Sequence, residues 1–331
     1  MSKARELANL GNAYSDGALS NRNLVINGSF IVSQRGSGRV FGQWYPLLDR
    51  WSTGQYQQAG HQQVSVSDPS VPTIKAVRVT SSSTSEAGSG TRMALGQMVE
   101  SKNCDFLAGK QVTLSFWIRF SSNTVSGTSS GFAYQINEYD TVDPSFYSTG
   151  GTRENNTYIS NGSYPTSWTK CTKTITCGST MKNLGVRFLF ADLFNTTNNS
   201  DAWYEVTAVQ LEVGDTATPF EHPRSYSDEL TRCERYYQLS GGVGRTNSTT
   251  GCDIYSIFKT PMRATPSASI NDGSFSVAQL GRAQVNINSI SLTYMQTNLS
   301  CGCVVVTSDT GMTPNIFAVT YGTAFAFDAE L

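Results

Sequence analysis

The stretch QVTLSFWIRF, residues 111–120, decides the fold class, because its apolar residues recur at every second position. One face of the segment is apolar throughout, and the other face is polar except for Trp117. Successive side chains of a β-strand point to opposite sides of the sheet, so a period of two predicts a half-buried antiparallel strand. The residues expected in the core are Val112, Leu114, Phe116, Ile118 and Phe120.

Stretches of the same character recur through residues 23–224, separated by clusters of Ser, Thr, Asn and Gly that are typical of turns. No helical pattern lies between them. The sequence therefore predicts an all-β domain over residues 23–224, a jelly-roll β-sandwich of the galactose-binding-like kind. Its other expected strands are LVINGSF (24–30), KAVRVT (75–80), ALGQMVE (94–100), GFAYQINEY (131–139), WTKCTKTITC (168–177), LGVRFLF (184–190) and WYEVTAVQLEV (203–213).

The run ATPFEHPRSYSDELTRCERYYQL, residues 217–239, interrupts the β pattern. Pro219 and Pro223 cannot occupy a central strand. Ser225 followed by Asp228 resembles a capping box with Asp in place of Glu, which predicts a short helix. The helix should bury one face, formed by Tyr226, Leu230, Cys233 and Tyr237.

Strand patterns return after this helix and continue to the end of the sequence. Seven short apolar stretches, from CDIYSIFK to AFAFDAEL, predict a second and smaller β-sandwich. We therefore expect a C-terminal domain over residues 225–331 that opens with the short helix.

Residues 1–22 show helical spacing, with Leu7, Leu10 and Tyr14 at intervals of three and four. A helix this short is marginal alone in water, so the apolar stripe must pack on something. One hypothesis is a surface helix on its own domain. The other is a parallel bundle around a threefold axis, in which the same three residues are the trimer contacts.

The composition excludes several classes of function. Charged residues make up 15% of the chain, and 24 basic residues nearly balance 25 acidic ones. No net field exists to attract nucleic acid or an anionic membrane surface. We find neither the apolar core of a signal peptide nor a membrane-spanning run, so we expect synthesis in the cytosol.

Histidine and cysteine usage argues against catalytic and metal chemistry. His61 and His222 are the only histidines, although histidine is the commonest general base and metal ligand near neutral pH. The seven cysteines contain no C-x-x-C pair, so neither a zinc site nor a disulfide framework is expected. The sequence predicts buried thiols, no metal and no cofactor.

Three stretches together resemble the fibre and appendage proteins of tailed bacteriophages, and they span nearly the whole chain. The most specific is residues 203–239, where a Val-Gln-Leu-Glu-x-Gly strand, a Thr-Pro-Phe-Glu exit and a Glu-Leu-x-x-Cys-x-Arg-Tyr-Tyr helix follow the family order. The others are NLVINGSFIVSQRGSGRVFGQWYPLLDRW (23–51) and MRATP (262–266) with the closing FDAEL (327–331).

The resemblance implies a non-enzymatic virion surface protein, made in the host cytoplasm and usually homotrimeric. Its jelly roll would be similar to carbohydrate-binding modules, with a distal β domain after it. The expected partners are other copies of the chain, virion proteins of tail or head, and a host surface glycan. A tail fibre or fibre-like appendage is the leading reading, and a head decoration or vertex knob is the alternative.

Within the first motif, the residue types favour a structural role. Asn27 and Gly28 suit a tight strand exit, and Asp49 with Arg50 suits a buried ion pair beside Trp51. No dense Asp cluster of the calcium-loop kind occurs, so no calcium ligand is named.

Sugar recognition needs aromatic platforms beside groups that read hydroxyls. The segment YQINEYDTVDPSFY, residues 134–147, and the GQWYP turn at 42–46 combine both. In the plainer reading, Tyr134 and Phe146 belong to the core and the acids to solvated turns. The candidate sugar-binding residues are Tyr139, Asp140, Tyr147, Trp44 and Tyr45.

A polysaccharide-degrading enzyme is the remaining alternative. It would need two carboxylates about 5 to 9 Å apart. With so few charged residues, most acids are explained by turns, and the periodicity of a long β-helix is missing. The acids that could supply the pair are Glu138, Asp140, Asp143, Asp192 and Asp201.

Overall fold

The computed structural model describes residues 22–38, 47–53, 60–80, 92–122, 131–144, 153–160, 163–191, 202–271, 275–287, 289–295, 301–308, 311–320 and 324–330. The chain divides into two compact units, one ending at Arg224 and the other comprising Ser225–Glu330. The N-terminal segment with Leu7, Leu10 and Tyr14 lies outside the described residues.

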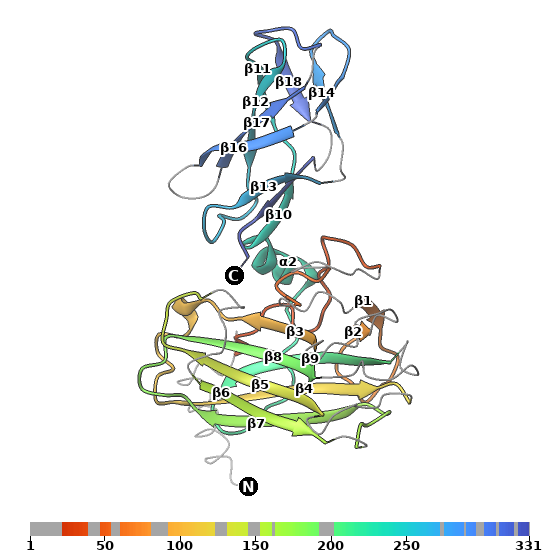
Figure 1. The fold of residues 1–331 in the computed structure, drawn as a ribbon, viewed down its shortest axis with the longest axis vertical. Helices are drawn as coiled ribbons and strands as arrows, with labels where there is room; N and C mark the ends of the chain where they lie inside the picture. Colours follow the sequence, from red (N-terminus) through yellow and green to blue (C-terminus); the bar gives the residue numbers. More distant parts are fainter. Residues whose placement is uncertain are drawn as a thin grey trace, which may run out of the picture. The chain divides into compact units, whose positions relative to one another are not determined.

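The first unit is a β-sandwich of two antiparallel sheets (Figure 1). A five-stranded sheet has the order β1-β2-β9-β4-β7, and a four-stranded sheet has the order β3-β8-β5-β6. This arrangement confirms the predicted all-β sandwich. The elements are β1 (Gly60–Ser65), β2 (Lys75–Thr80), β3 (Arg92–Met98), the 3-10 helix η1 (Ser101–Asn103), β4 (Gln111–Phe120), β5 (Phe132–Tyr139), β6 (Arg153–Ile159), β7 (Thr169–Thr176), β8 (Asn183–Ala191) and β9 (Trp203–Val213).

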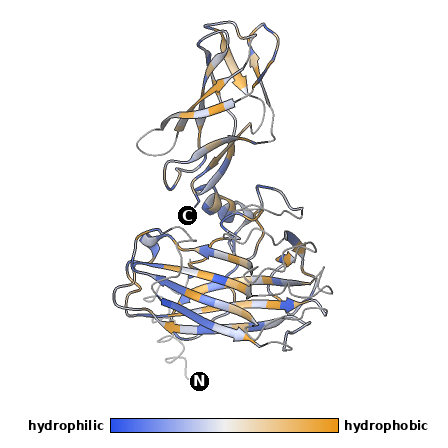
Figure 2. Cartoon of the chain, viewed as in Figure 1, coloured by the Kyte–Doolittle hydropathy of each residue, from blue (hydrophilic) through white to orange (hydrophobic). Residues whose placement is uncertain are grey.

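The core of this unit lies between the two sheets and contains all five predicted apolar residues of β4. Their rings meet the facing sheet: the centroid of Phe116 lies 4.8 Å from that of Phe188, and Phe120 lies 5.2 Å from Phe132. Figure 2 shows the alternation of apolar and polar residues along the strands. Burial of one such side chain contributes about 1.5–3 kcal/mol, so the period of two determines which face turns inward.

The second unit is also antiparallel β structure. One sheet has the order β10-β19-β13, and a seven-stranded sheet has the order β15-β14-β18-β11-β12-β17-β16. Because β13 lies beside β16, the sheets form a nearly closed barrel around one core. The elements are α2 (Tyr226–Glu234), β10 (Tyr237–Ser240), β11 (Val243–Thr246), β12 (Gly251–Ile257), β13 (Ser267–Ile270), β14 (Phe275–Gln279), β15 (Val285–Ile287), β16 (Ser289–Met295), β17 (Cys301–Thr307), β18 (Phe317–Thr320) and β19 (Phe325–Asp328).

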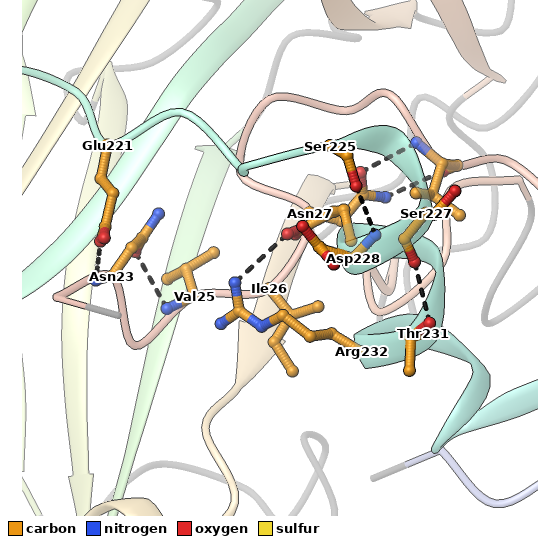
Figure 3. Close-up of polar contacts among 12 residues, drawn as sticks. Asn23, Val25, Ile26, Asn27, Glu221, Ser225, Ser227, Asp228, Thr231 and Arg232 are labelled. Atoms are coloured by element: carbon orange, nitrogen blue, oxygen red, sulfur yellow. Dashed lines mark hydrogen bonds and ion pairs between the residues drawn. The ribbon is translucent and has the colours of Figure 1, made fainter. Parts of the chain in front are cut away.

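Helix α2 has the predicted N-terminal cap. The Ser225 hydroxyl accepts a hydrogen bond from the backbone N–H of Asp228 at 3.1 Å (Figure 3). The expected burial is confirmed at Cys233 and Tyr237 and is wrong at Tyr226, which is 54% exposed. Tyr237 lies in β10 and not on the helix, because the helix ends at Glu234.

The segment that precedes β1 is fastened to β9 through Asn23. Its side-chain amide donates to the carbonyl of Val209 at 2.9 Å and accepts from the N–H groups of Val25 and Leu211. Its own N–H donates to the carboxylate of Glu221 at 2.9 Å (Figure 3). The beginning of the first motif is therefore joined directly to the strand β9 and to the Thr-Pro-Phe-Glu exit of the second motif.

The strand expected over residues 24–30 is wrong: the chain bends and turns there, with left-handed φ angles at Asn27 and Phe30. Asn27 holds this turn, and its φ of +58° is a conformation that Asn tolerates better than most residues. The side chain bonds both the N–H and the carbonyl of Val32 and also donates to the carbonyl of Asp49. The indole N–H of Trp51 donates to the Asn27 carbonyl at 3.0 Å.

The ion pair of Asp49 differs from the expected one. Asp49 pairs with Arg35 at 3.1 Å, whereas the Arg50 guanidinium donates to the carbonyl of Met98 at 2.6 Å. Arg50 follows Asp49 directly and has a φ of +73°, so the two side chains serve different partners.

The Gln-x-Glu of the second motif fastens the chain that leaves β9. Glu212 accepts hydrogen bonds from both the N–H and the hydroxyl of Thr218. Gln210 donates to Glu212 and accepts from the N–H of Glu221 at 2.7 Å. Gln210 and Glu212 thus hold the chain in place where it leaves β9, which explains why the motif has these two residues.

Gly28 should be irreplaceable, because a Cβ at this position would collide with the Val209 carbonyl oxygen. We expect Gly28→Ala to destabilise the first unit by about 1–3 kcal/mol, which lowers Tm by about 5 °C. Gly38→Ala is the control, since a Cβ there has no neighbour within 4 Å. Thermal unfolding followed by circular dichroism measures both variants; equal melting temperatures would contradict the close approach.

Candidate functional site

Of the predicted sugar-binding residues, Tyr139 and Asp140 are described by the structure. Trp44, Tyr45 and Tyr147 lie outside the described residues. Tyr139 ends β5 and is 4% exposed, and Asp140 follows it directly. Their sugar-binding role stays a prediction, and their position directs attention to the outer face of the four-stranded sheet.

This outer face is built from alternate residues of β5. Phe132, Tyr134 and Ile136 turn into the core, so Gln135, Asn137 and Tyr139 turn outward. In register with Gln135 lie Arg187 of β8 and Asn156 of β6, and Tyr158 of β6 lies opposite Ala133. We call this surface the amide face; it comprises Gln135, Asn137, Tyr139, Asn156, Tyr158 and Arg187.

Four polar atoms of the amide face are buried and have no hydrogen-bond partner among the described residues. Three are the side-chain amide oxygens of Gln135, Asn137 and Asn156, and the fourth is Nε of Arg187. A buried polar group without a partner costs about 1–3 kcal/mol. Atoms of this kind also occur away from the amide face, at the Tyr204 hydroxyl and at Oδ1 of Asn183, so burial without a partner does not by itself mark a ligand site.

The amide face is open along the edge strand β6. Tyr158 is 54% exposed, and Glu154, opposite Asn137, is also exposed. The face closes toward β5, where Gln135 is 3% exposed and Asn137 1%. An exposed aromatic ring therefore lies beside a row of amides, which is the combination that sugars require.

Tyr139 lies at the closed end of this face. Burial raises the pKa of its hydroxyl, while a hydrogen bond with Asn137 and the charge of Arg187 act in the opposite direction. A Cβ on Gly185, opposite Asn137, would lie 3.6 Å from Cε2 of Tyr139. Gly185 thus leaves room for the ring on the same face.

The carboxylates near the end of β5 have partners within the chain. Glu138, 2% exposed, accepts hydrogen bonds from Arg153, Asn155 and the N–H of Gly178. Asp140 accepts from Arg153 at 3.1 Å and from the Thr180 hydroxyl at 3.0 Å. These acids position loops.

Asp143 is held in the same way. It accepts hydrogen bonds from the N–H and hydroxyl of Ser101 and from the side chain of Asn183. Because Ser101 opens η1, this carboxylate ties the end of β5 to the turn after β3.

The thiols are also structural. All seven cysteines are free, and burial raises the pKa of Cys104 to about 12 and that of Cys171 to about 11. A thiol with so high a pKa is a poor nucleophile near neutral pH. Within the described ranges, no group of three His, Cys, Asp or Glu residues is arranged to hold a metal ion. In the same ranges, no helix has the length and apolar character needed to cross a membrane.

No family model matches the chain, and no curated protein matches it. Among solved structures it is similar to a family 16 carbohydrate-binding module, at 14% identity over 57% of this chain and 99% of that one, with a TM-score of 0.32. It is similar to the CBM22-1 xylan-binding domain of Paenibacillus barcinonensis Xyn10C, at 9% identity over 50% and 87%, with a TM-score of 0.32. It is also similar to the enzymatically active domain of bacteriophage CBA120 tailspike protein 4, at 9% identity over 58% and 21%, with a TM-score of 0.33. At these values the similarities carry no argument about function.

Sequence reasoning missed Gln135, Asn156, Tyr158 and Arg187. The available signal was the alternation in FAYQINEY, where polar residues take the positions that face away from the core. The partners on β6 and β8 are distant in sequence, and only the strand register brings them opposite Gln135.

Two buried glutamines should respond oppositely to the same substitution. Gln97, 1% exposed, bonds both the N–H and the carbonyl of Ile26, at 2.8 and 2.7 Å. Gln97→Met should therefore cost about 2 kcal/mol or more, whereas Gln135→Met should be neutral or stabilising. Urea unfolding measures both; a comparable loss in Gln135→Met would mean that its amide is satisfied.

Proposed function

We propose that this protein is a carbohydrate-binding virion surface protein of a tailed bacteriophage that holds host glycans on its amide face. The observation that carries the proposal is the exposed ring of Tyr158, which lies beside the polar side chains of the amide face. The phage assignment is supported by the motif resemblance over residues 23–51 and 203–239.

The chemistry of the amide face suits a pyranose. Sugar hydroxyls can hydrogen-bond with the half-buried side chains of Asn156 and Arg187 and with the exposed carboxylate of Glu154. The apolar face of the ring can stack on Tyr158.

The proposed role is binding without catalysis. Glycoside hydrolysis needs one carboxyl group as a proton donor and a second carboxylate free to act on the sugar or on water. Glu138 and Asp140 are both engaged by Arg153, and further donors saturate Glu138. The amide face supplies hydrogen bonds instead.

Presentation in several copies would compensate for weak single sites. Linked sites gain avidity on the order of 100-fold or more when they can engage together. We propose a homotrimer whose contacts include Leu7, Leu10 and Tyr14, placed on a tail fibre or fibre-like appendage; a head decoration or vertex knob is the alternative location.

Glycan binding is tested with an array of neutral bacterial surface glycans and with calorimetry on the glycan that binds best. We expect Asn156→Leu and Tyr158→Ala each to weaken binding about tenfold or more, because each removes a contact worth about 1–3 kcal/mol. Gln111→Met is the control, since Gln111 is an exposed glutamine on β4 of the other sheet. Unchanged affinity in both face variants, with folding intact, would refute the site.

The trimer is tested by light scattering of the full chain. We expect three times the monomer mass of 35.9 kDa, and substitution of Leu7, Leu10 and Tyr14 by Ser should shift the mass toward one copy. A monomer of the unsubstituted chain that persists at high concentration would contradict the bundle.

A further inference from the structure

The five-stranded sheet carries a second polar group on its own outer face. Arg78 of β2 lies opposite Glu205 of β9, and Arg119 of β4 lies opposite Glu205 from the other side. The residues next to them on the same strands belong to the core, so the side chains of Arg78, Arg119 and Glu205 turn away from the core. These core neighbours are Val79, Tyr204, Val206, Ile118 and Phe120. With Trp168 and Trp203 they form what we call the arginine–tryptophan cluster.

Glu205 is fully buried and organises the two arginines. Arg78 donates to its Oε1 through Nε and Nη2, at 2.7 and 2.5 Å, and Arg119 donates to its Oε2 through Nε at 2.6 Å. Both carboxylate oxygens are thus engaged, and neither guanidinium can rotate without losing a charge-assisted hydrogen bond.

The indole rings fix the guanidinium groups further. The Arg78 guanidinium lies 4.3 Å from the ring centroid of Trp203. That of Arg119 lies 4.8 Å from Trp168 and 5.6 Å from Trp203. Stacking on aromatic rings favours the planar guanidinium over an ammonium group.

The cluster retains donors that Glu205 does not use. Nη1 of Arg78 and both Nη atoms of Arg119 make no hydrogen bond to Glu205. The two side chains are 32% and 31% exposed, so solvent and ligands can reach them. Rigid N–H donors of this kind match the two oxygens of a carboxylate.

The net charge of the surroundings is close to balance. Asp68 is fully exposed; hydrogen bonds from Ser70 lower its pKa, and the charge of Arg119 contributes in the same direction. Asp68 and Glu205 together offset the two arginines, and Lys170 of β7, opposite Trp117 on the same face, adds one positive charge. Selection by this cluster therefore depends on the geometry of the N–H donors more than on a long-range field.

We propose that the arginine–tryptophan cluster is a second saccharide site, selective for acidic sugars that bear a carboxylate. The carboxylate is held by the free N–H groups of Arg78 and Arg119, and the sugar ring lies against the exposed part of Trp203. This site is on the opposite sheet from the amide face and does not depend on it.

The experiment measures binding of an oligogalacturonate, and of its carboxyl-reduced neutral counterpart, to the full chain by calorimetry. We expect the acidic oligomer to bind and the reduced oligomer to bind about tenfold or more weakly. Arg119→Lys and Arg78→Lys keep the charge but lose the planar fork, so each should lose about tenfold or more in affinity for the acid. Arg153→Lys, at the ion pair with Glu138 and Asp140, is the control and should bind as the unsubstituted chain does.

Thermal unfolding of each variant identifies any loss of affinity that is caused by misfolding. The two arginine variants test the site independently of each other. Absence of binding to the acid, equal binding of the reduced oligomer, or full affinity in both folded arginine variants would overturn the inference. Gln135→Met should leave acid binding unchanged. Failure of the amide face would appear with neutral glycans alone, so the two proposals fail separately.

Discussion

The first unit depends on the approach of Gly28 to the backbone of β9. The Gly28 carbonyl accepts a hydrogen bond from the N–H of Val209. The two backbone segments lie so close that a side chain at position 28 would collide with the Val209 carbonyl. Asn23 reinforces the contact from the same side, through the Val209 carbonyl. With this approach made, Phe30 and Trp51 enter the core, with their ring centroids 4.9 Å apart.

The polar residues of the first unit divide into two kinds by their partners. Asn23, Asn27, Gln210 and Glu212 of the motifs each bond backbone groups that would otherwise be buried without a partner. Some polar atoms have no hydrogen-bond partner among the described residues, both on the amide face and at the Tyr204 hydroxyl of the second motif. The first kind explains why the motifs have their residues.

The two sheets also differ in how they prepare a surface. The four-stranded sheet offers neutral amides and an exposed tyrosine, which suits hydroxyl groups. The five-stranded sheet offers guanidinium groups held by the buried Glu205 and by indole rings. The two proposed sites therefore differ in the chemistry of the groups they would bind, and neither proposal includes a metal ion.

The amino-acid sequence determined the inward faces of the strands, as in β4, and the cap of α2 at Ser225, because both depend on neighbours only a few residues away. It also pointed to the segment that contains Tyr139. Strand register decided the rest: Arg187 and Asn156 meet Gln135, and Arg78 meets Glu205, across gaps of many residues. Alternation shows that a side chain faces outward but not which strand lies beside it, since that pairing is fixed by long-range packing of the sandwich.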